Sequence, residues 1–181
     1  MREAMEAFWQ RGYHATSVTD LLGEMKLNRG SLYGTFGDKK KLFLAALAEY
    51  EKQGHEMVRS ALERPGSARK ALEAWVRDSA DSCTGESGLR GCLALKAAME
   101  MAPQDAAVAQ WVKDVTHDRE LQVAKAIRRG QAEAEINPRL DPRVLARFLI
   151  SALAGLRVMG TASPSERDLR GVVELILHSM D

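Results

Sequence analysis

The sequence predicts an all-α protein of nine helices, with a short N-terminal domain over residues 1–45 and a larger helical domain over residues 46–181. Two observations support this prediction. Apolar residues recur at helical spacing along the chain, and no segment shows the alternation and the β-branched and aromatic enrichment of a strand. A chain of 181 residues that is 45% hydrophobic and 28% charged can bury a core and has a globular composition.

The first predicted helix carries an apolar stripe at Ala4, Ala7 and Phe8. It ends at Gly12, because glycine readily takes the left-handed conformation found at helix ends. The stripe is already under way in the first residues of the chain. We therefore expect this helix to be clipped at its start.

Residues 17–36 predict two short helices joined by a tight turn. Ser17 and Asp20 form a capping box, which begins a helix that runs to about Met25. After the turn at residues 26–28, Asn28 caps a second helix from residue 29 to about residue 36. The pattern is typical of a helix-turn-helix, whose second helix is narrow enough to enter a DNA major groove. An ordinary helical corner would have the same spacing.

Six further helices are expected after Gly37. The fourth is long and ends at Pro65-Gly66, and Ser67 caps the fifth. Residues 81–90 predict a loop, because glycine and small polar residues destabilise a helix interior. The sixth helix covers residues 91–101, and the seventh begins at residues 103–105 and can reach residue 135. Asp141-Pro142 opens the eighth, and a capping box at residues 163–166 opens the ninth, which runs to about residue 180.

Composition excludes several classes of protein. No apolar run approaches the roughly 18 residues that cross a bilayer, and the start lacks a secretory signal pattern, so we expect a cytoplasmic protein with no membrane partner. Cys83 and Cys92 are too few for a disulfide scaffold and match no zinc motif. The net charge of +1 argues against nonspecific coating of nucleic acid, although residues 1–45 hold seven basic residues against five acidic ones.

Residue identities within the first 45 positions resemble the signature of the tetracycline-repressor (TetR) family. The resemblance rests on Phe8, Gly12-Tyr13, residues 16–18, the run Leu27-Asn28-Arg29-Gly30-Ser31-Leu32-Tyr33-Gly34-Thr35-Phe36-Gly37-Asp38-Lys39, and Leu42. The chain length and the nine-helix count are also similar to that family. The resemblance implies a DNA-binding N-terminal domain, a C-terminal domain for ligand binding and dimerisation, and a double-stranded DNA operator as partner.

The resemblance also implies roles for particular side chains. Arg29 is the best candidate to read a guanine, because its planar fork can meet O6 and N7 together. Leu21, Leu32 and Phe36 should form the small core of this domain. Gly34 leaves room near the DNA but offers no contact. The expected DNA-binding residues are Asn28, Arg29, Gly30, Ser31, Gly34 and Thr35 on or near the recognition helix, and Tyr33, Thr16 or Ser17, Thr19 and Lys39 at phosphates.

The last two predicted helices are apolar around much of their circumference, so each needs burial on two sides. A homodimer would supply the second side as a four-helix bundle, which is how the resembled family usually dimerises. Buried helices of a monomer are the alternative. A dimer would present two recognition helices to an inverted-repeat operator. The predicted dimer interface consists of Leu145, Leu149, Ala152, Leu153, Leu156, Leu169, Val172, Val173 and Ile176.

Large or adaptable side chains in the body are candidates for a small-molecule inducer pocket, although each is as readily plain core. They are Trp75, Met99, Trp111, Phe148 and Met159, together with Cys92. Cys92 follows Arg90-Gly91 at the start of a predicted helix, where a thiol pKa is lowered. One interpretation of Cys92 is a thiol that senses oxidants or electrophiles, with Cys83 as its disulfide partner. The alternative interpretation is a small thiol buried in the core.

Signatures of an enzyme are missing from the sequence. His55-Glu56 begins like a zinc metalloprotease helix, but Arg59 stands where the second histidine is needed. No phosphate-binding loop, nucleophile elbow or paired cysteine cluster occurs, so we expect no catalysis, no metal and no cofactor. A helical adaptor that binds no DNA is the remaining alternative.

Overall fold

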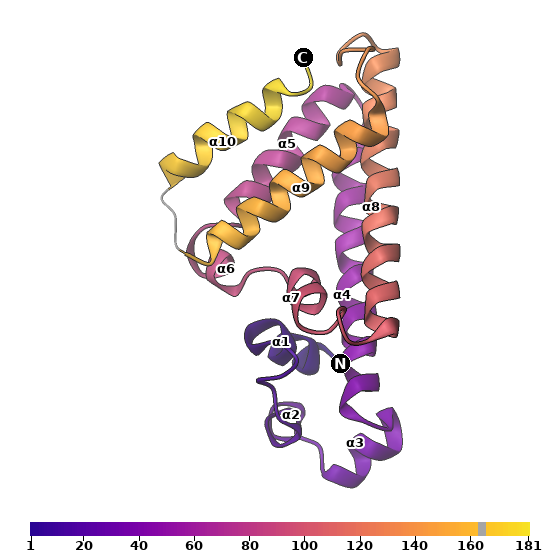
Figure 1. Cartoon of the computed structure of the whole chain (residues 1–181), viewed down its shortest axis with the longest axis vertical. Coiled ribbons are helices and arrows are strands. Elements are labelled where there is room, and N and C mark those ends of the chain that lie inside the picture. The colour runs from indigo at the N-terminus through magenta and orange to yellow at the C-terminus, as the bar shows by residue number, and fades with distance from the viewer. Residues whose placement is uncertain (163–165) are drawn as a thin grey trace. The chain divides into compact units, whose positions relative to one another are not determined.

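The computed structural model describes residues 1–162 and 166–181, and every regular element in that part of the chain is a helix (Figure 1). The helices are α1 (Arg2–Arg11), α2 (Val18–Met25), α3 (Arg29–Phe36), α4 (Lys39–Leu62), α5 (Ala68–Asp81), α6 (Gly85–Arg90), α7 (Leu93–Glu100), α8 (Ala106–Ala132), α9 (Pro142–Gly160) and α10 (Glu166–His178). The all-α prediction is confirmed, and the nine expected helices are found at their expected places. None of the helices in the described residues is long and apolar enough to cross a membrane.

The short helix α6 corrects the prediction of a loop over residues 81–90. Gly88 has no room for a side chain, because a Cβ there would collide with the backbone carbonyl of Cys83 and lie 3.3 Å from the Gly160 carbonyl oxygen. The low helix propensity of glycine predicts a loop at this position. Here the glycine is the residue that lets a helix pack closely against its neighbours, so tertiary packing overrides the local propensity.

The helix boundaries follow from caps that the sequence predicts. Gly12 ends α1 with a φ of 81° and donates its N–H to the Phe8 carbonyl. Ser67 caps α5 by accepting from Lys70 N, and Asp141 caps α9 by accepting from the backbone N–H groups of residues 143 and 144. The predicted capping box at residues 163–166 lies outside the described residues, and α10 begins at Glu166.

The chain divides into two compact units. Unit 1 comprises residues 1–54 and 92–115, and unit 2 comprises residues 55–91 and 116–181. Unit 1 therefore combines α1 to α3 and the first part of α4 with α7 and the start of α8, which come from the middle of the chain.

Unit 1 has its own hydrophobic core. Phe8 of α1 and Phe43 of α4 meet edge to face with ring centroids 4.9 Å apart, and both are buried. Leu21 of α2 and Leu32 of α3 join this core, as does Leu93 of α7. The expected core roles of Leu21 and Leu32 are confirmed, and Phe36 packs against the same cluster while partly exposed.

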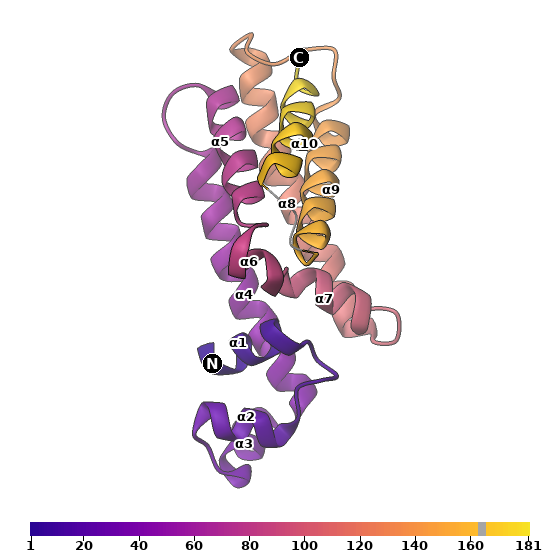
Figure 2. The ribbon, with the colours of Figure 1, turned by 90° about the vertical axis from the view of Figure 1, so that its left-hand side faces the viewer.

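Unit 2 is a separate core built mainly from α5, α8, α9 and α10. Helix α10 packs on α5, α5 packs on α9, and α9 contacts α10, so these three helices enclose a common interior (Figure 2). Leu72, Val76, Ile127, Leu149 and Met180 are its largest fully buried side chains. The fold thus supplies two independent frames, one for the helix-turn-helix and one for the remaining helices.

Candidate nucleic-acid interface

Helices α2 and α3 and the turn between them form the predicted helix-turn-helix. Ser17 and Asp20 form the capping box, with the Asp20 N–H donating to Ser17 Oγ at 3.0 Å and the Ser17 N–H donating to Asp20 Oδ2 at 2.8 Å. Lys26 makes the turn in the left-handed conformation, with φ 53° and ψ 42°. Asn28 then caps α3, its Oδ1 accepting from the Ser31 N–H at 2.8 Å. Every local signal read in this segment is confirmed.

Helix α3 presents a polar outer surface. Only Leu32 is fully buried, and its side chain anchors the helix to the core of unit 1. The remaining predicted contact residues on or next to α3 are exposed, namely Asn28, Arg29, Gly30, Ser31, Tyr33, Gly34 and Thr35. No acidic residue lies in the first turn of α3, so the positive end of its dipole is open to an anion. Arg29 is the single cation on this helix.

The candidate phosphate contacts flank α3 on its neighbours. Ser17 and Thr19 are exposed at the start of α2, and 41% of the Tyr33 surface is exposed on α3. Thr16 is a correction, because its side chain is buried and its hydroxyl donates to the Gly12 carbonyl at 2.7 Å. A buried hydroxyl cannot reach a phosphate, so the Thr16 side chain serves the structure of the corner between α1 and α2.

Lys39 is less free than the sequence suggests. Its ammonium lies 4.2 Å from the centroid of the Tyr13 ring, in a cation–π arrangement. Partial burial lowers the pKa of Lys39 from its ordinary value, with Glu100 and Asp20 opposing that effect. Two exposed cations that the sequence reasoning did not select, Lys26 in the turn and Lys41 on the first turn of α4, lie on the same segment. Their basic charge was the only signal that could have found them.

The six candidate inducer residues are not brought together. Cys92, Met99 and Trp111 belong to unit 1, whereas Trp75, Phe148 and Met159 belong to unit 2. Trp75 is a buried member of the unit 2 core. Met99, Phe148 and Met159 are 74%, 47% and 59% exposed in the single chain, so their part in an inducer pocket stays a prediction.

The residues of the predicted dimer interface lie mostly on the inner side of α9 and α10. Most of them face the interior of unit 2 and are buried within a single chain, and these are Leu145, Leu149, Leu153, Leu156, Leu169, Val173 and Ile176. Ala152 is partly buried against the same core, and Val172 is 42% exposed. Helical spacing identified an apolar stripe correctly, but it could not say which of two apolar faces is the inner one. The exposed apolar residues of α9 and α10 are Val144, Phe148, Val158, Met159, Val172 and Leu175.

Neither cysteine forms a disulfide. Cys83 is buried, and its thiol donates to the Ser79 carbonyl at 3.2 Å. Cys92 stands at the N-cap position of α7, and its sulfur lies 3.4 Å from the hydroxyl of Tyr50. Among the described residues, no group of three or more His, Cys, Asp or Glu side chains is placed to hold a metal ion.

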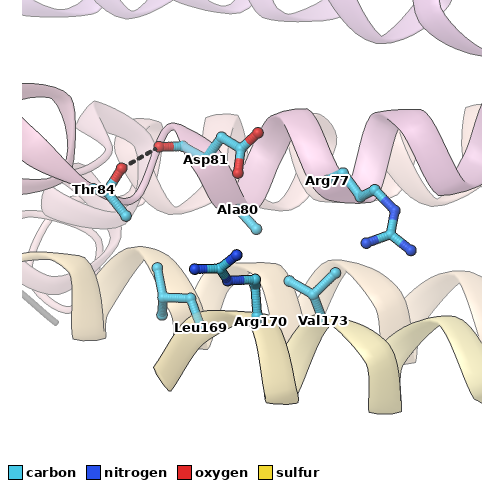
Figure 3. Close-up of a pocket in the computed structure, with 7 residues that line it drawn as sticks. All are labelled: Arg77, Ala80, Asp81, Thr84, Leu169, Arg170 and Val173. Carbon is cyan, nitrogen blue, oxygen red and sulfur yellow. Dashed lines mark hydrogen bonds between the residues drawn. The ribbon is translucent and has the colours of Figure 1, made fainter. Parts of the chain in front are cut away.

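A surface pocket of about 270 Å³ lies between α5 and α10 in unit 2 (Figure 3). Its walls combine apolar side chains with two arginines, and they consist of Arg77, Ala80, Asp81, Thr84, Leu169, Arg170 and Val173. Arg77 pairs with Glu174 at 2.8 Å, and Thr84 Oγ1 donates to the Asp81 carbonyl. Sequence reasoning missed this pocket, because its residues come from two segments, 77–84 and 169–173, that lie far apart in the chain.

Known proteins resemble the whole chain. Residues 1–46 match the family model of bacterial regulatory proteins of the tetR family, and residues 66–174 match the model of the tetracyclin repressor-like C-terminal domain. An uncharacterized HTH-type transcriptional regulator of Bacillus subtilis, YezE, is 27% identical over all of this chain and 94% of its own length. The HTH-type transcriptional repressor ComR of Escherichia coli is 29% identical over 86% of this chain and 75% of its own.

Solved structures agree with these matches. A cysteine mutant of the TetR family transcriptional regulator CifR, complexed with 26-base-pair double-strand operator DNA, is 31% identical with a TM-score of 0.87. The alignment covers 99% of this chain and 94% of that one. The reduced form of NemR from E. coli shares the fold, with a TM-score of 0.85 and 19% identity. The helix-turn-helix, the helical body and these matches together identify the chain as a DNA-binding transcriptional regulator of the TetR family.

Proposed function

We propose that this protein is a homodimeric repressor that binds an inverted-repeat operator and is released from it by a small-molecule inducer. The observation that supports this proposal most strongly is the surface of α3. One buried leucine anchors the helix, while every predicted base-contact side chain next to it is exposed. No part of the proposal requires catalysis.

Arg29 is the proposed base-reading residue. It is exposed at the first position of α3, directly after the cap. Residues at the N-terminal end of a recognition helix are those that contact base edges in the major groove. Ser17 and Thr19 at the start of α2 and Tyr33 within α3 are proposed to contact phosphates around it, because exposed hydroxyl groups bind phosphate oxygens.

The second copy is proposed to bind to the exposed apolar faces of α9 and α10. Val144, Phe148 and Met159 lie along one side of α9 at helical spacing, and Leu175 of α10 is 73% exposed. A monomer seldom leaves so many large apolar side chains in water, and burial against a symmetry mate would remove them from it.

DNA binding is tested by selecting duplexes from a random library with the full-length protein and measuring affinity over a range of salt. We expect an inverted repeat to be selected and binding to weaken steeply as salt rises. Arg29→Ala should weaken binding to the selected duplex by about 1–3 kcal/mol and relax its sequence preference. Arg64→Ala is the matched control, because Arg64 is an exposed arginine in unit 2. Failure of the wild-type protein to bind any duplex at low salt would refute the proposal.

Inducer release is tested on the same selected duplex. Small molecules that raise the melting temperature of the protein are candidates, and an inducer must also lower its affinity for the duplex, because the two binding events are thermodynamically linked. The pocket between α5 and α10 is one candidate site, because it combines apolar walls with a few charged side chains.

A thiol sensor at Cys92 is the second candidate function. The observation that favours it is the placement of Cys92, which is partly exposed at the N-cap position of α7 with the Tyr50 hydroxyl 3.4 Å from its sulfur. Labelling at graded pH should then find Cys92 more reactive than Cys83, which is buried. Oxidant should release the selected duplex from the wild type and from Cys83→Ser but not from Cys92→Ser. Oxidant-insensitive binding by the wild type would refute this candidate.

A further inference from the structure

Helix α7 holds the end of α1 through one lysine. The Lys96 ammonium donates to the backbone carbonyl of Trp9 at 2.6 Å and to that of Gln10 at 2.9 Å. These carbonyls belong to the last turn of α1, where carbonyl groups have no partner within the helix and the dipole is negative. A lysine from another helix therefore neutralises the C-terminus of α1.

The same helix holds the next segment of chain through one carboxylate. Glu100 Oε2 accepts from the backbone N–H of Tyr13 at 2.8 Å and from that of His14 at 3.2 Å. Successive N–H groups that converge on one oxygen make a small anion-binding concavity, which Glu100 fills from within the protein. The Glu100 backbone carbonyl is itself held by the side-chain amide of Gln104 at 2.7 Å.

Gly12 lies between the two contacts and permits both. Its φ of +81° is a conformation that other L residues rarely adopt, and a Cβ at this position would collide with the Glu100 carboxylate. The glycine thus serves two purposes, since it ends α1 and leaves room for the carboxylate. The Glu100 carboxylate can approach the backbone this closely only because residue 12 has no side chain.

The corner that α7 holds is the one from which α2 starts. Thr16 Oγ1 donates to the Gly12 carbonyl at 2.7 Å, and Ser17 next to it caps α2. Tyr13 carries Lys39 of α4 over its ring, and Phe43 packs 5.0 Å from it. The position of the helix-turn-helix within unit 1 therefore depends on the backbone of residues 12–16.

We propose that Lys96 and Glu100 are positioning residues for DNA binding: together they form a clamp on α7 that fixes the corner between α1 and α2 and thereby the orientation of the recognition helix. The inference rests on the proposed DNA-binding function. The two residues lie outside the stretch 1–46 that matches the N-terminal family model. The two residues bind backbone groups of opposite polarity. Lys96 binds carbonyl groups, and Glu100 binds N–H groups.

Hydrogen exchange tests the clamp without DNA. In the full-length protein, Glu100→Gln should speed exchange at the Tyr13 and His14 amides by about tenfold, because a hydrogen bond to a charged group is lost or weakened. Amides in the core of unit 2 should exchange as before. Unchanged protection at Tyr13 and His14 in this variant would overturn the inference.

Duplex affinity tests the positioning role. Glu100→Gln removes a negative charge, so simple electrostatics predicts tighter binding to DNA, whereas a loosened corner predicts about tenfold weaker binding to the selected duplex. Lys96→Met should weaken binding to a similar degree, and Lys113→Met, at an exposed lysine of α8, should not exceed the small effect of losing one charge. Melting curves are recorded for every variant, so that a loss of affinity is compared among proteins that are folded at the assay temperature.

A charge swap separates the clamp from a simple ion pair. If Lys96 and Glu100 acted only by attracting each other, the double variant Lys96→Glu with Glu100→Lys would restore the affinity of the wild type. If each reads the backbone of the corner, the swap brings like charges to both ends and binds more weakly than either single variant. Restoration by the swap, or wild-type affinity of Glu100→Gln, would overturn the inference. Absence of duplex binding by the wild type would instead refute the proposed function, and exchange at Tyr13 and His14 would still report whether the clamp exists.

Discussion

Helices α3 and α9 differ in what their outer faces offer to a partner. Helix α3 has eight residues, buries Leu32 alone and exposes polar groups and one cation. Helix α9 has 19 residues, buries a full stripe that includes Leu149 and Leu153, and still exposes Val144 and Phe148. A polar outer face suits a hydrated, charged partner such as DNA, whereas an apolar outer face suits another protein surface.

The two helices also differ in what holds them to the protein. Helix α3 depends on the buried Leu32, on the partly buried Phe36 and on the Asn28 cap, so little of its stability comes from burial. Helix α9 contributes many side chains to the core of unit 2 and loses little when its outer face changes. Changes to the anchor of α3 should therefore act on stability, and changes to the outer face of α9 should act on association.

The largest effect is expected from removal of the α3 anchor. Leu32→Ala leaves a cavity in the fully buried core of unit 1 and should lower the free energy of unfolding by about 2–5 kcal/mol. Chemical denaturation measures the change, and duplex binding should be lost in parallel. Thr35→Ala, at an exposed position of the same helix, is the control and should change stability by less than about 0.5 kcal/mol. A Leu32→Ala protein of wild-type stability would contradict the view that Leu32 is the main anchor of α3.

A charge on the outer face of α9 should act on association instead. Phe148→Glu, 47% exposed in the single chain, should dissociate the dimer and weaken binding to a two-half-site duplex on the order of a hundredfold, because the second half-site contact is no longer tethered. Sedimentation measures the oligomeric state, and the fold should remain intact. Leu175→Glu on α10 should behave alike. Met57→Glu, at a residue of α4 that is 71% exposed, is the control, and dissociation by that variant as well would contradict the assignment of the interface.

These two helices also show how far the sequence predicts the structure. The caps at Ser17, Asn28 and Asp141 depend on side chains that bond to backbone two or three residues away, so local sequence was sufficient to find them. The inner face of α9 cannot be told from its outer face by sequence, because Leu149 and Phe148 are equally apolar and only the position of other helices decides which is buried. The loop expected over residues 81–90 failed for the same reason, since Gly88 is set by packing.

The candidate site divides in the same way. The residues of α3 that are proposed to face DNA follow from a short motif with fixed spacing and are exposed, whereas Thr16, which precedes α2, is buried. The clamp of Lys96 and Glu100 joins residues 86 or 87 positions apart, and no pattern within α7 indicates a partner in α1. Long-range contacts between a side chain and a backbone group carry no periodic signal, so sequence reasoning had nothing from which to predict them.

A smaller effect is expected from removal of the serine that caps the short helix α2, compared with removal of a serine inside the long helix α4. Ser17→Ala removes the oxygen that accepts the Asp20 N–H and should lower the free energy of unfolding by about 1 kcal/mol. Ser60→Ala, at an exposed serine within α4, is the control and should be neutral or slightly stabilising, since alanine favours a helix interior. Urea denaturation measures both. Equal effects of the two substitutions would show that the capping box contributes nothing to the stability of unit 1.

The smallest effect concerns the charge on two caps, one in each unit. Hydrogen bonds from the backbone of Val144 and Arg143 lower the pKa of Asp141 below its ordinary value of 3.8, and the Ser17 hydroxyl and amide do the same for Asp20. A lowered pKa in the folded state means that the carboxylate stabilises the fold above the ordinary value and that this contribution is lost as the pH falls through the lowered pKa.

Asp141→Asn and Asp20→Asn should therefore be less stable than the wild type at neutral pH and approach its stability as the medium becomes strongly acidic. Asparagine keeps a capping oxygen, so the difference between the two proteins isolates the charge at the helix start. Urea denaturation at about pH 7 and about pH 2 measures it. Helix α2 has eight residues and α9 has 19, so the shorter helix should open locally more easily when its start is weakened. Hydrogen exchange should therefore speed up more at the α2 amides in Asp20→Asn than at the α9 amides in Asp141→Asn. A difference that persists unchanged in acid would mean that the geometry of the cap, rather than its charge, holds these helix starts.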